Sequence, residues 1–183
     1  MDQIWHQNYG NKPRDIEWKT LGSMADVIET ALLKFASKPA VHCLGTTRTY
    51  GEIDKASRDL AAYLQNALGH VKGDRVAIML PNIMAFNVAS YAVIRSGMVQ
   101  VNVNPLYTPR ELKHQLNDAG VETIIIAAMA TPTLASVIAE TDVKNVITVQ
   151  IGDLIDAPVP PVDVVAGIPS SVTLIDALEM GAG

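Results

Sequence analysis

The chain has 183 residues, of which 49% are hydrophobic, and it carries a formal net charge of −5. This length and composition suit one packed globular domain and exclude a disordered chain. The acidic balance and the lack of a Lys/Arg cluster exclude nucleic acid as the main partner, and a single cysteine, Cys43, excludes an intrachain disulfide and a cysteine-based zinc site.

The first residues, MDQIWHQNYGNKPRD, carry polar residues throughout and lack the apolar run of a secretory signal. No segment approaches the ~20 uninterrupted apolar residues that span a bilayer. We therefore expect a cytoplasmic protein, and peripheral contact with a membrane stays open.

Residues 1–21 form a predicted N-terminal arm without a periodic pattern. This arm carries both tryptophans of the chain, Trp5 and Trp18. Such large apolar side chains are expected to pack against a surface. Three surfaces stay open: the chain's own domain, the remainder of a longer enzyme, or a second subunit.

Residues 22–150 are predicted to form an α/β subdomain. Ser23, with Asp26 three residues later, predicts the start of a helix that Pro39 stops. Two short strands, 40–44 and 48–50, then flank a turn of Gly45-Thr46-Thr47 and predict a hairpin.

A second capping box, Thr49 with Glu52, opens the next predicted helix. Its apolar residues recur at helical spacing and predict one buried stripe. This stripe consists of Ile53, Ser57, Leu60, Ala61, Leu64 and Leu68.

Four apolar runs then begin at residues 75, 99, 123 and 145, so that successive starts are 24, 24 and 22 residues apart. This is the length of a strand plus a crossover helix, and continuously apolar runs are typical of strands covered on both faces. The runs are Arg75–Leu80, Val99–Val103, Thr123–Ala127 and Asn145–Val149, with helices expected at Ile83–Ser96, Pro109–Ala119 and Pro132–Glu140. The sequence thus predicts an α/β fold with a mainly parallel sheet flanked by helices on both faces.

The sequence specifies the start of the helix at Pro109. Thr108 is the expected N-cap, Pro109 occupies the first helical position, and the side chain of Glu111 is expected to accept the backbone N–H of Thr108. Thr131-Pro132 is expected to open the following helix in the same way. The turn before Thr108, Asn102–Tyr107, follows the carboxyl end of a strand, which is where open α/β sheets bind ligands. Folding explains the cap, but it does not readily explain a Leu-Tyr pair in a turn.

Residues 151–183 are predicted to be a linker and the start of a next, missing part. The segment GDLIDAPVPPVDVVAGIPSS is rich in proline and small residues and has no period. A last strand at Val172–Leu174 and a short helix at Asp176–Met180 stay open.

The familiar fingerprints of nucleotide and metal sites are missing from the sequence. It contains neither G-x-G-x-x-G nor G-x-x-x-x-G-K-[S/T], and its four histidines have no metal-ligand spacing, so we predict no metal site. Cys43 and the methionines are interpreted as core residues. Met79 and Met84 flank a strand end, and for these two an apolar pocket is the alternative.

Several segments resemble long-chain fatty acid–CoA ligases of the adenylate-forming superfamily. They are MLPN (Met79–Asn82), RSGM (Arg95–Met98), TYGEIDKASRDLAAYLQNALG, NVNPLYTPREL and HQLNDAG. The resemblance implies the N-terminal part of an enzyme that activates a fatty acid with ATP and Mg²⁺ to an acyl-adenylate and then transfers the acyl group to coenzyme A.

The resemblance carries over few functional residues. The ATP loop, acyl tunnel and catalytic lysine of the family lie downstream of residue 183, so it implies no catalytic residue here and no tightly bound cofactor. In relatives, the turn equivalent to Asn104, Pro105, Leu106 and Tyr107 lies near coenzyme A, which makes these four the candidate cofactor-binding residues. Some relatives dimerise through the N-terminal arm, and the resemblance therefore implies a homodimer contact.

The expected function is thus that of a fatty acid–CoA ligase fragment that is inactive alone, because adenylation needs phosphate-binding donors and a positioned lysine. A stand-alone, non-catalytic module that binds an acyl chain or a sister subunit is the alternative. A nucleotide-binding α/β protein of another kind is a third interpretation, which the missing glycine fingerprints disfavour.

Overall fold

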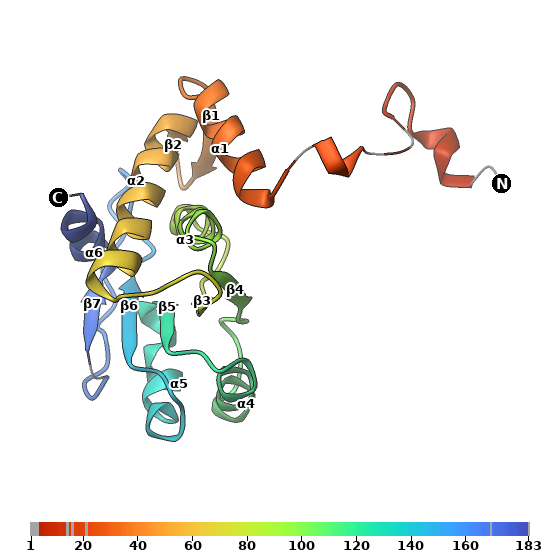
Figure 1. Ribbon diagram of the computed structural model, residues 1–183. Coiled ribbons are helices and arrows are strands. Elements are labelled where there is room, and N and C mark those ends of the chain that lie inside the picture. The colour runs from red at the N-terminus through yellow and green to blue at the C-terminus, as the bar shows by residue number, and fades with distance from the viewer. Residues whose placement is uncertain (1–3, 14, 16, 21, 169, 183) are drawn as a thin grey trace.

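The computed structural model describes residues 4–13, 15, 17–20, 22–168 and 170–182. In this part of the chain, a five-stranded parallel sheet with the order β4-β3-β5-β6-β7 carries helices on both faces (Figure 1). The strands are β3 (Arg75–Met79), β4 (Val99–Asn102), β5 (Thr123–Ala127), β6 (Asn145–Val149) and β7 (Ser171–Thr173). The predicted α/β class is confirmed.

The sheet separates two apolar cores, because successive side chains of a strand point to opposite faces. In β5, Ile125 belongs to one core, and Ile124 and Ile126 belong to the other. The first core is covered by α1 (Met24–Lys34), α2 (Tyr50–Ala62), α3 (Met84–Arg95) and α6 (Leu174–Gly181), and the second by α4 (Pro109–Ala119) and α5 (Thr131–Ala135) (Figure 1).

The helix starts that the sequence specifies are confirmed at the level of single hydrogen bonds. Three reciprocal capping boxes form: Ser23 with Asp26, Thr49 with Glu52, and Thr108 with Glu111. The predicted end of the first helix is wrong, because α1 ends at Lys34 and Pro39 instead begins β1. Between Phe35 and Lys38, the chain turns on a backbone hydrogen bond of 2.7 Å from the Lys38 amide.

The predicted hairpin is confirmed, with a shorter turn. Strands β1 (Pro39–Cys43) and β2 (Thr46–Thr49) pair antiparallel. The turn consists of Leu44 and Gly45, whose φ angles are 47° and 82°, and not of Gly45-Thr46-Thr47. Two successive positive φ angles match the right-handed twist of the strands, which a turn through two threonines would not.

Strand β4 contradicts the expectation that every strand is covered on both faces. It lies at the edge of the sheet, and its Val99 is 46% exposed. Gln115 of α4 donates from Nε2 to the carbonyl oxygen of Asn102 at 2.8 Å and so shields part of the open edge.

The prediction of a single helix at Pro132–Glu140 is also wrong. Helix α5 ends at Ala135, and a separate 3-10 turn spans Ile138–Glu140. Between them Val137 adopts a φ of −133°, which interrupts the helical hydrogen bonds. Thr131 does not cap α5, because its hydroxyl donates to the carbonyl oxygen of Ala128 at 2.6 Å from inside the first turn.

The described residues between 151 and 170 contain neither helix nor strand, as the composition predicts. Beyond them, β7 pairs with β6, and α6 packs against α2 so closely that a Cβ on Gly181 would lie 1.8 Å from the carbonyl oxygen of Asp59. The predicted domain boundaries at residues 21 and 150 remain predictions.

The N-terminal arm leads away from the rest of the molecule (Figure 1). It contains 3-10 turns at Ile4–Asn8 and Trp18–Thr20. Ile4 is 77% exposed and Trp5 is 53% exposed, so these two side chains do not pack on the chain's own domain. The side chain of Trp18 lies outside the described part of the structure.

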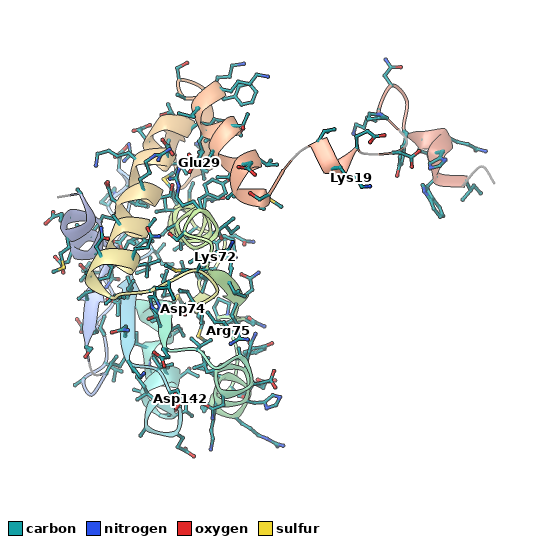
Figure 2. The ribbon with its side chains drawn as sticks, viewed as in Figure 1. Lys19, Glu29, Lys72, Asp74, Arg75 and Asp142 are labelled. Carbon is teal, nitrogen blue, oxygen red and sulfur yellow. The ribbon has the colours of Figure 1, made fainter. Side chains whose placement is uncertain are left out.

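The helical layer over the first core is held together by a network of charges around Arg95. The Arg95 side chain, 5% exposed, donates from Nη2 to Asp54 at 2.7 Å and from Nε to Glu29 at 2.8 Å. Arg58 pairs with the second oxygen of both carboxylates, at 2.6 Å from Glu29 and 3.1 Å from Asp54. Glu29 lies on α1, beside α2 and α3 (Figure 2).

The Asp54 carboxyl in this network stays charged in the folded protein. Burial alone raises its pKa, but the hydrogen bonds and charges of Arg95 and Arg58 outweigh burial, so that the pKa of Asp54 is lowered overall. A lowered folded-state pKa stabilises the fold above the unfolded-state pKa of about 4, and this contribution is lost as the pH falls through the folded-state value.

We predict that Arg95→Met lowers the free energy of unfolding by about 3 kcal/mol at pH 7, because it leaves two carboxylates sharing one exposed arginine. The difference from the unmodified chain should shrink as the pH falls from 5 toward 2, since the Asp54 carboxyl, whose pKa is lowered in the folded protein, becomes neutral. Urea unfolding followed by circular dichroism at several pH values measures both effects.

Lys55→Met is the matched control. Lys55 forms an ion pair of 2.6 Å with Asp59 on the same helix layer, but its side chain is 73% exposed, so its removal should cost less than about 1 kcal/mol. Equal losses in the two variants would contradict a special role for the Arg95 network.

Candidate functional site

The carboxyl edge of the sheet has a topological switch point between β3 and β5. The chain leaves β3 through α3 on one face to reach β4, and it leaves β5 through α5 on the other face to reach β6. Connections that diverge in this way leave a crevice between the two strand ends, and open α/β sheets bind their ligands there. The four sequence-predicted residues lie on the turn that follows β4, at the same edge.

The structure gives three of these four residues a role in folding. Asn104 accepts the backbone N–H of Leu106 at its Oδ1 at 3.0 Å and so closes the turn, in which Pro105 occupies the next position. Tyr107 is half-buried and packs against the second core. Leu106, in contrast, is 88% exposed. Of the predicted set, Leu106 is therefore the side chain that folding leaves unexplained.

The N-terminus of α4, beside this turn, does not favour the binding of an anion. Both the backbone N–H and the hydroxyl of Thr108 donate to one oxygen of Glu111, at 2.8 and 2.7 Å. These two hydrogen bonds, the hydroxyl's first, lower the pKa of the Glu111 carboxyl and keep it charged. A phosphate would meet this carboxylate at the start of α4. The cation that faces the adjoining surface hollow is Arg110, which shares that hollow with Thr108, Glu111 and His114.

A carboxylate in the first turn opposes phosphate binding at three more helix starts in the same way. An acidic residue lies in the first turn of α1, α2 and α6 as well as α4, namely Asp26, Glu52, Asp176 and Glu111. Only α3, of the helices of eight or more residues in the described chain, starts without one. With no glycine-rich loop in the sequence, the residues present do not fit the triphosphate of ATP.

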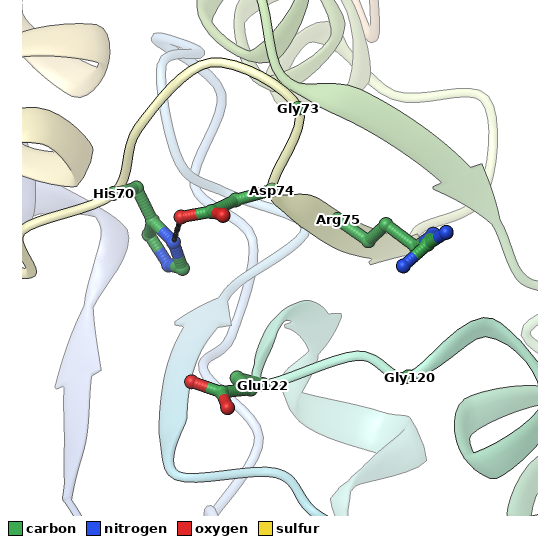
Figure 3. A pocket seen from close by; sticks show the side chains of 6 residues that line it. All are labelled: His70, Gly73, Asp74, Arg75, Gly120 and Glu122. Carbon is green, nitrogen blue, oxygen red and sulfur yellow. Dashed lines mark hydrogen bonds and ion pairs between the residues drawn. The ribbon is translucent and has the colours of Figure 1, made fainter.

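A second hollow lies at the opposite, amino edge of the sheet (Figure 3). It is lined by His70, Gly73, Asp74, Arg75, Gly120 and Glu122. His70 contacts Asp74 through Nδ1 at 3.0 Å and Thr123 through Nε2 at 2.7 Å. Both ring nitrogens are engaged within the protein, which leaves neither free for a metal, and the hydroxyl at the end of this chain belongs to Thr123, which is fully buried and out of reach of a substrate. The role of His70 here is therefore structural.

The sequence pattern assigned His70 no role, and the structure leaves it 9% exposed and paired with Asp74 and Thr123. The signal was present: Asp74 follows four residues later, and its pKa is lowered, first by the N–H of Val71 and then by His70. Within the described residues, no group of three or more His, Cys, Asp or Glu side chains is arranged to hold a metal ion. None of the helices found there is long and apolar enough to cross a bilayer.

A family profile and the curated relatives agree on the kind of protein that this chain resembles. The profile of the family described as AMP-binding enzyme matches residues 28–166. Long-chain-fatty-acid–CoA ligases of Yersinia pestis and Salmonella typhimurium are 42% and 43% identical to the chain over 86% and 84% of its length. The chain spans 28% of the length of each of these curated relatives.

Solved structures of the same kind share the fold. A long-chain-fatty-acid–CoA ligase from Archaeoglobus fulgidus superimposes with a TM-score of 0.69 at 24% identity, over 87% of this chain and 30% of that one. An anthranilate CoA ligase in complex with anthranoyl-AMP gives a TM-score of 0.70 at 17% identity, over 85% of this chain and 27% of that one. At these identities the likeness establishes the fold alone.

We predict that Leu106→Ser changes the free energy of unfolding by less than about 0.5 kcal/mol, because the side chain lies in water. Asn104→Ala, two residues away, should cost about 1 kcal/mol, because the amide of Leu106 loses its acceptor. Urea unfolding compares the two. A loss of more than 1 kcal/mol for Leu106→Ser would show that Leu106 stabilises the fold. Its exposure would then no longer be a reason to assign it a binding role.

Proposed function

Because this chain belongs to the AMP-binding enzyme family, we propose that it is the N-terminal part of a long-chain fatty acid–CoA ligase. Such an enzyme uses ATP and Mg²⁺ to convert a fatty acid to an acyl-adenylate with release of pyrophosphate, and it then transfers the acyl group to the thiol of coenzyme A. The observation that carries the proposal is the 42% identity to long-chain ligases over 86% of the chain.

The 183 residues by themselves are proposed to be inactive. Attack of a carboxylate on the α-phosphate of ATP builds negative charge, and catalysis needs fixed N–H or cationic groups around that charge. In the described residues, Arg95 and Arg58 are committed to Glu29 and Asp54, and the first turns of four helices carry carboxylates. This chain is therefore a scaffold, and the groups that hold ATP and Mg²⁺ belong to the part of the relatives that it does not span.

For the coenzyme A step, the turn at Asn104–Tyr107 is the proposed contact. An exposed Leu106 offers an apolar surface to the base of the nucleotide, and Arg110 is the cation next to the turn. Glu111 opposes a phosphate at the start of α4, so the proposed contact involves the base and not the phosphates. Because a long-chain fatty acid partitions into bilayers, peripheral contact with a membrane belongs to the same proposal.

The test compares the 183-residue chain with the product of its full reading frame. We expect no ATP–pyrophosphate exchange dependent on a fatty acid from the 183 residues, and clear exchange from the longer product with a long-chain acid. Exchange by the 183 residues would overturn the scaffold proposal. A longer product that activates only aromatic acids would overturn the fatty acid assignment.

The exposed arm supports a second candidate, an interaction between subunits. We propose that Ile4 and Trp5 pack against a second copy of the chain, because these two large apolar side chains are adjacent in the sequence, both lie in water, and their burial would be favourable. If this contact were the chain's whole function, the chain would be a non-catalytic interaction module. A reading frame that continues into a Gly-Thr-Thr-Gly loop would reject that module but would not argue against the contact between subunits.

We predict that the mass from light scattering rises with protein concentration, and that Trp5→Asp shifts this rise to higher concentration by about tenfold or more. Leu33→Asp is the control, because Leu33 is 66% exposed on α1 and lies outside the arm. A mass of one chain at all concentrations, or equal effects of the two substitutions, would contradict a contact through the arm.

A further inference from the structure

The connection from β6 to β7 contains no helix, and its middle part, residues 157–165, has the proline-rich sequence APVPPVDVV. We refer to this segment as the proline strap. Proline fixes its own φ at about −65°, and it pushes the residue before it to an extended conformation. Because Pro158, Pro160 and Pro161 are so close together, every residue from 157 to 161 is restricted in one of these two ways. This part of the strap therefore adopts the polyproline II conformation.

Contacts that hold the proline strap on the domain recur every three residues. Val159 lies against Gly152, where an added Cβ would come within 3.4 Å of the Val159 Cβ. The backbone of Val162 exchanges two hydrogen bonds, of 2.8 and 2.9 Å, with the side-chain amide of Gln150. The N–H of Val165 donates to a threonine hydroxyl at the start of α5 at 3.3 Å. A polyproline II helix has about three residues per turn, so the three valines lie along the one face that is attached to the domain.

The prolines of the strap face water. Pro158, Pro160 and Pro161 are all exposed. Pro158 and Pro161 are three residues apart and share a face, which gives the spacing P-x-x-P. Within the described part of the chain, the carbonyl oxygens of residues 157–161 accept no hydrogen bond from the protein. Exposed proline rings beside free carbonyl oxygens are the features that aromatic-lined, proline-binding grooves recognise.

The strap is ordered before any partner arrives. Its prolines restrict the backbone, and the contacts of Val159, Val162 and Val165 fix its position on the domain. A partner that binds a segment ordered in this way pays little conformational entropy. The strap thus differs from a proline-rich linker, which has to be ordered on binding.

The charges at the two ends of the strap define what the partner's groove carries. Asp156, on one side, is already paired with Arg48 at 2.7 Å. Asp163, two residues after the last proline, is exposed and forms no ion pair with the described residues. A groove that accepts the strap therefore gains from a cation at the end that meets Asp163.

From this geometry we infer that the proline strap is a docking segment for another protein, whose groove is lined with aromatic side chains and carries a cation at one end. Pro158 and Pro161 pack on the aromatic side chains, and the ion pair of Asp163 fixes the direction in which the strap lies in the groove. The inference does not depend on the proposed ligase activity.

The test titrates the 183-residue chain into ¹⁵N-labelled protein modules that bind polyproline II segments, namely an SH3, a WW and an EVH1 domain in turn. We expect the indole N–H signal of the groove tryptophan to move along a saturable curve in at least one module. A flat or linear response in all three modules would overturn the inference.

Three variants locate the binding. Pro158→Ala and Pro161→Ala each remove one ring from the exposed face, and each should weaken binding to the module by about tenfold. Asp163→Lys should weaken it several-fold at low salt and less at high salt, because the ion pair is screened. All variants are compared with the unmodified chain by far-UV circular dichroism, so that a loss of affinity is not a loss of fold.

Pro109→Ala is the matched control, because Pro109 is also exposed but lies at the start of α4, outside the strap. Its affinity should equal that of the unmodified chain. An equal loss in Pro109→Ala, or unchanged affinity in both strap proline variants, would contradict docking through the strap. Self-association that Pro161→Ala abolishes, without binding to any module, would assign the strap to a second copy of the chain and reject the inferred partner.

Discussion

The side chain of Arg95 is the contact on which the helical layer of this domain depends. It is buried at the end of α3, and it reaches Glu29 on α1, 66 residues earlier in the chain, and Asp54 on α2, 41 residues earlier. Removing such a guanidinium from water is costly, and the cost is offset because five hydrogen bonds, to carboxylates, a hydroxyl and a carbonyl oxygen, surround it. This one ionic centre thus ties α3 to both α1 and α2 beside the apolar core that they share.

The carboxylates at the helix starts bear on the proposal that this chain is a scaffold. Carboxylates at the starts of α1, α2, α4 and α6 satisfy backbone N–H groups and favour folding. They also occupy the positions at which a helix would bind phosphate. Among the described helices of eight or more residues, α3 is the one whose first turn carries no carboxylate, so only its start is free of this opposition to a phosphate.

Local signals made much of the fold predictable. A capping box needs four residues, so Thr108 and Glu111 specified the start of α4, and the apolar run at Thr123–Ala127 specified β5. The errors arose where position in the sheet or a competing hydrogen bond decides: β4 has the apolar run of a central strand but lies at an edge, and the hydroxyl of Thr131 donates to Ala128 instead of capping α5. The turn at Asn104–Tyr107 was located correctly, but the Arg95 network joins α1 to α2 and α3 across 29 to 66 positions, which no local pattern encodes.

The two edges of the sheet differ in a way that bears on where chemistry takes place. At the amino edge, the polar groups are satisfied within the domain: His70 binds Asp74 and Thr123, and Glu122 pairs with Lys144 at 2.7 Å. At the carboxyl edge, apolar side chains that folding does not use lie in water, with Leu106 88% and Met129 60% exposed. Exposed apolar surface is unfavourable, but the amino edge exposes some as well, with Val71 63% and Val99 46% exposed, so exposure alone does not separate the two edges. What distinguishes the carboxyl edge is the topological switch point between β3 and β5, and topology is therefore the argument that favours this edge for the proposed coenzyme A contact.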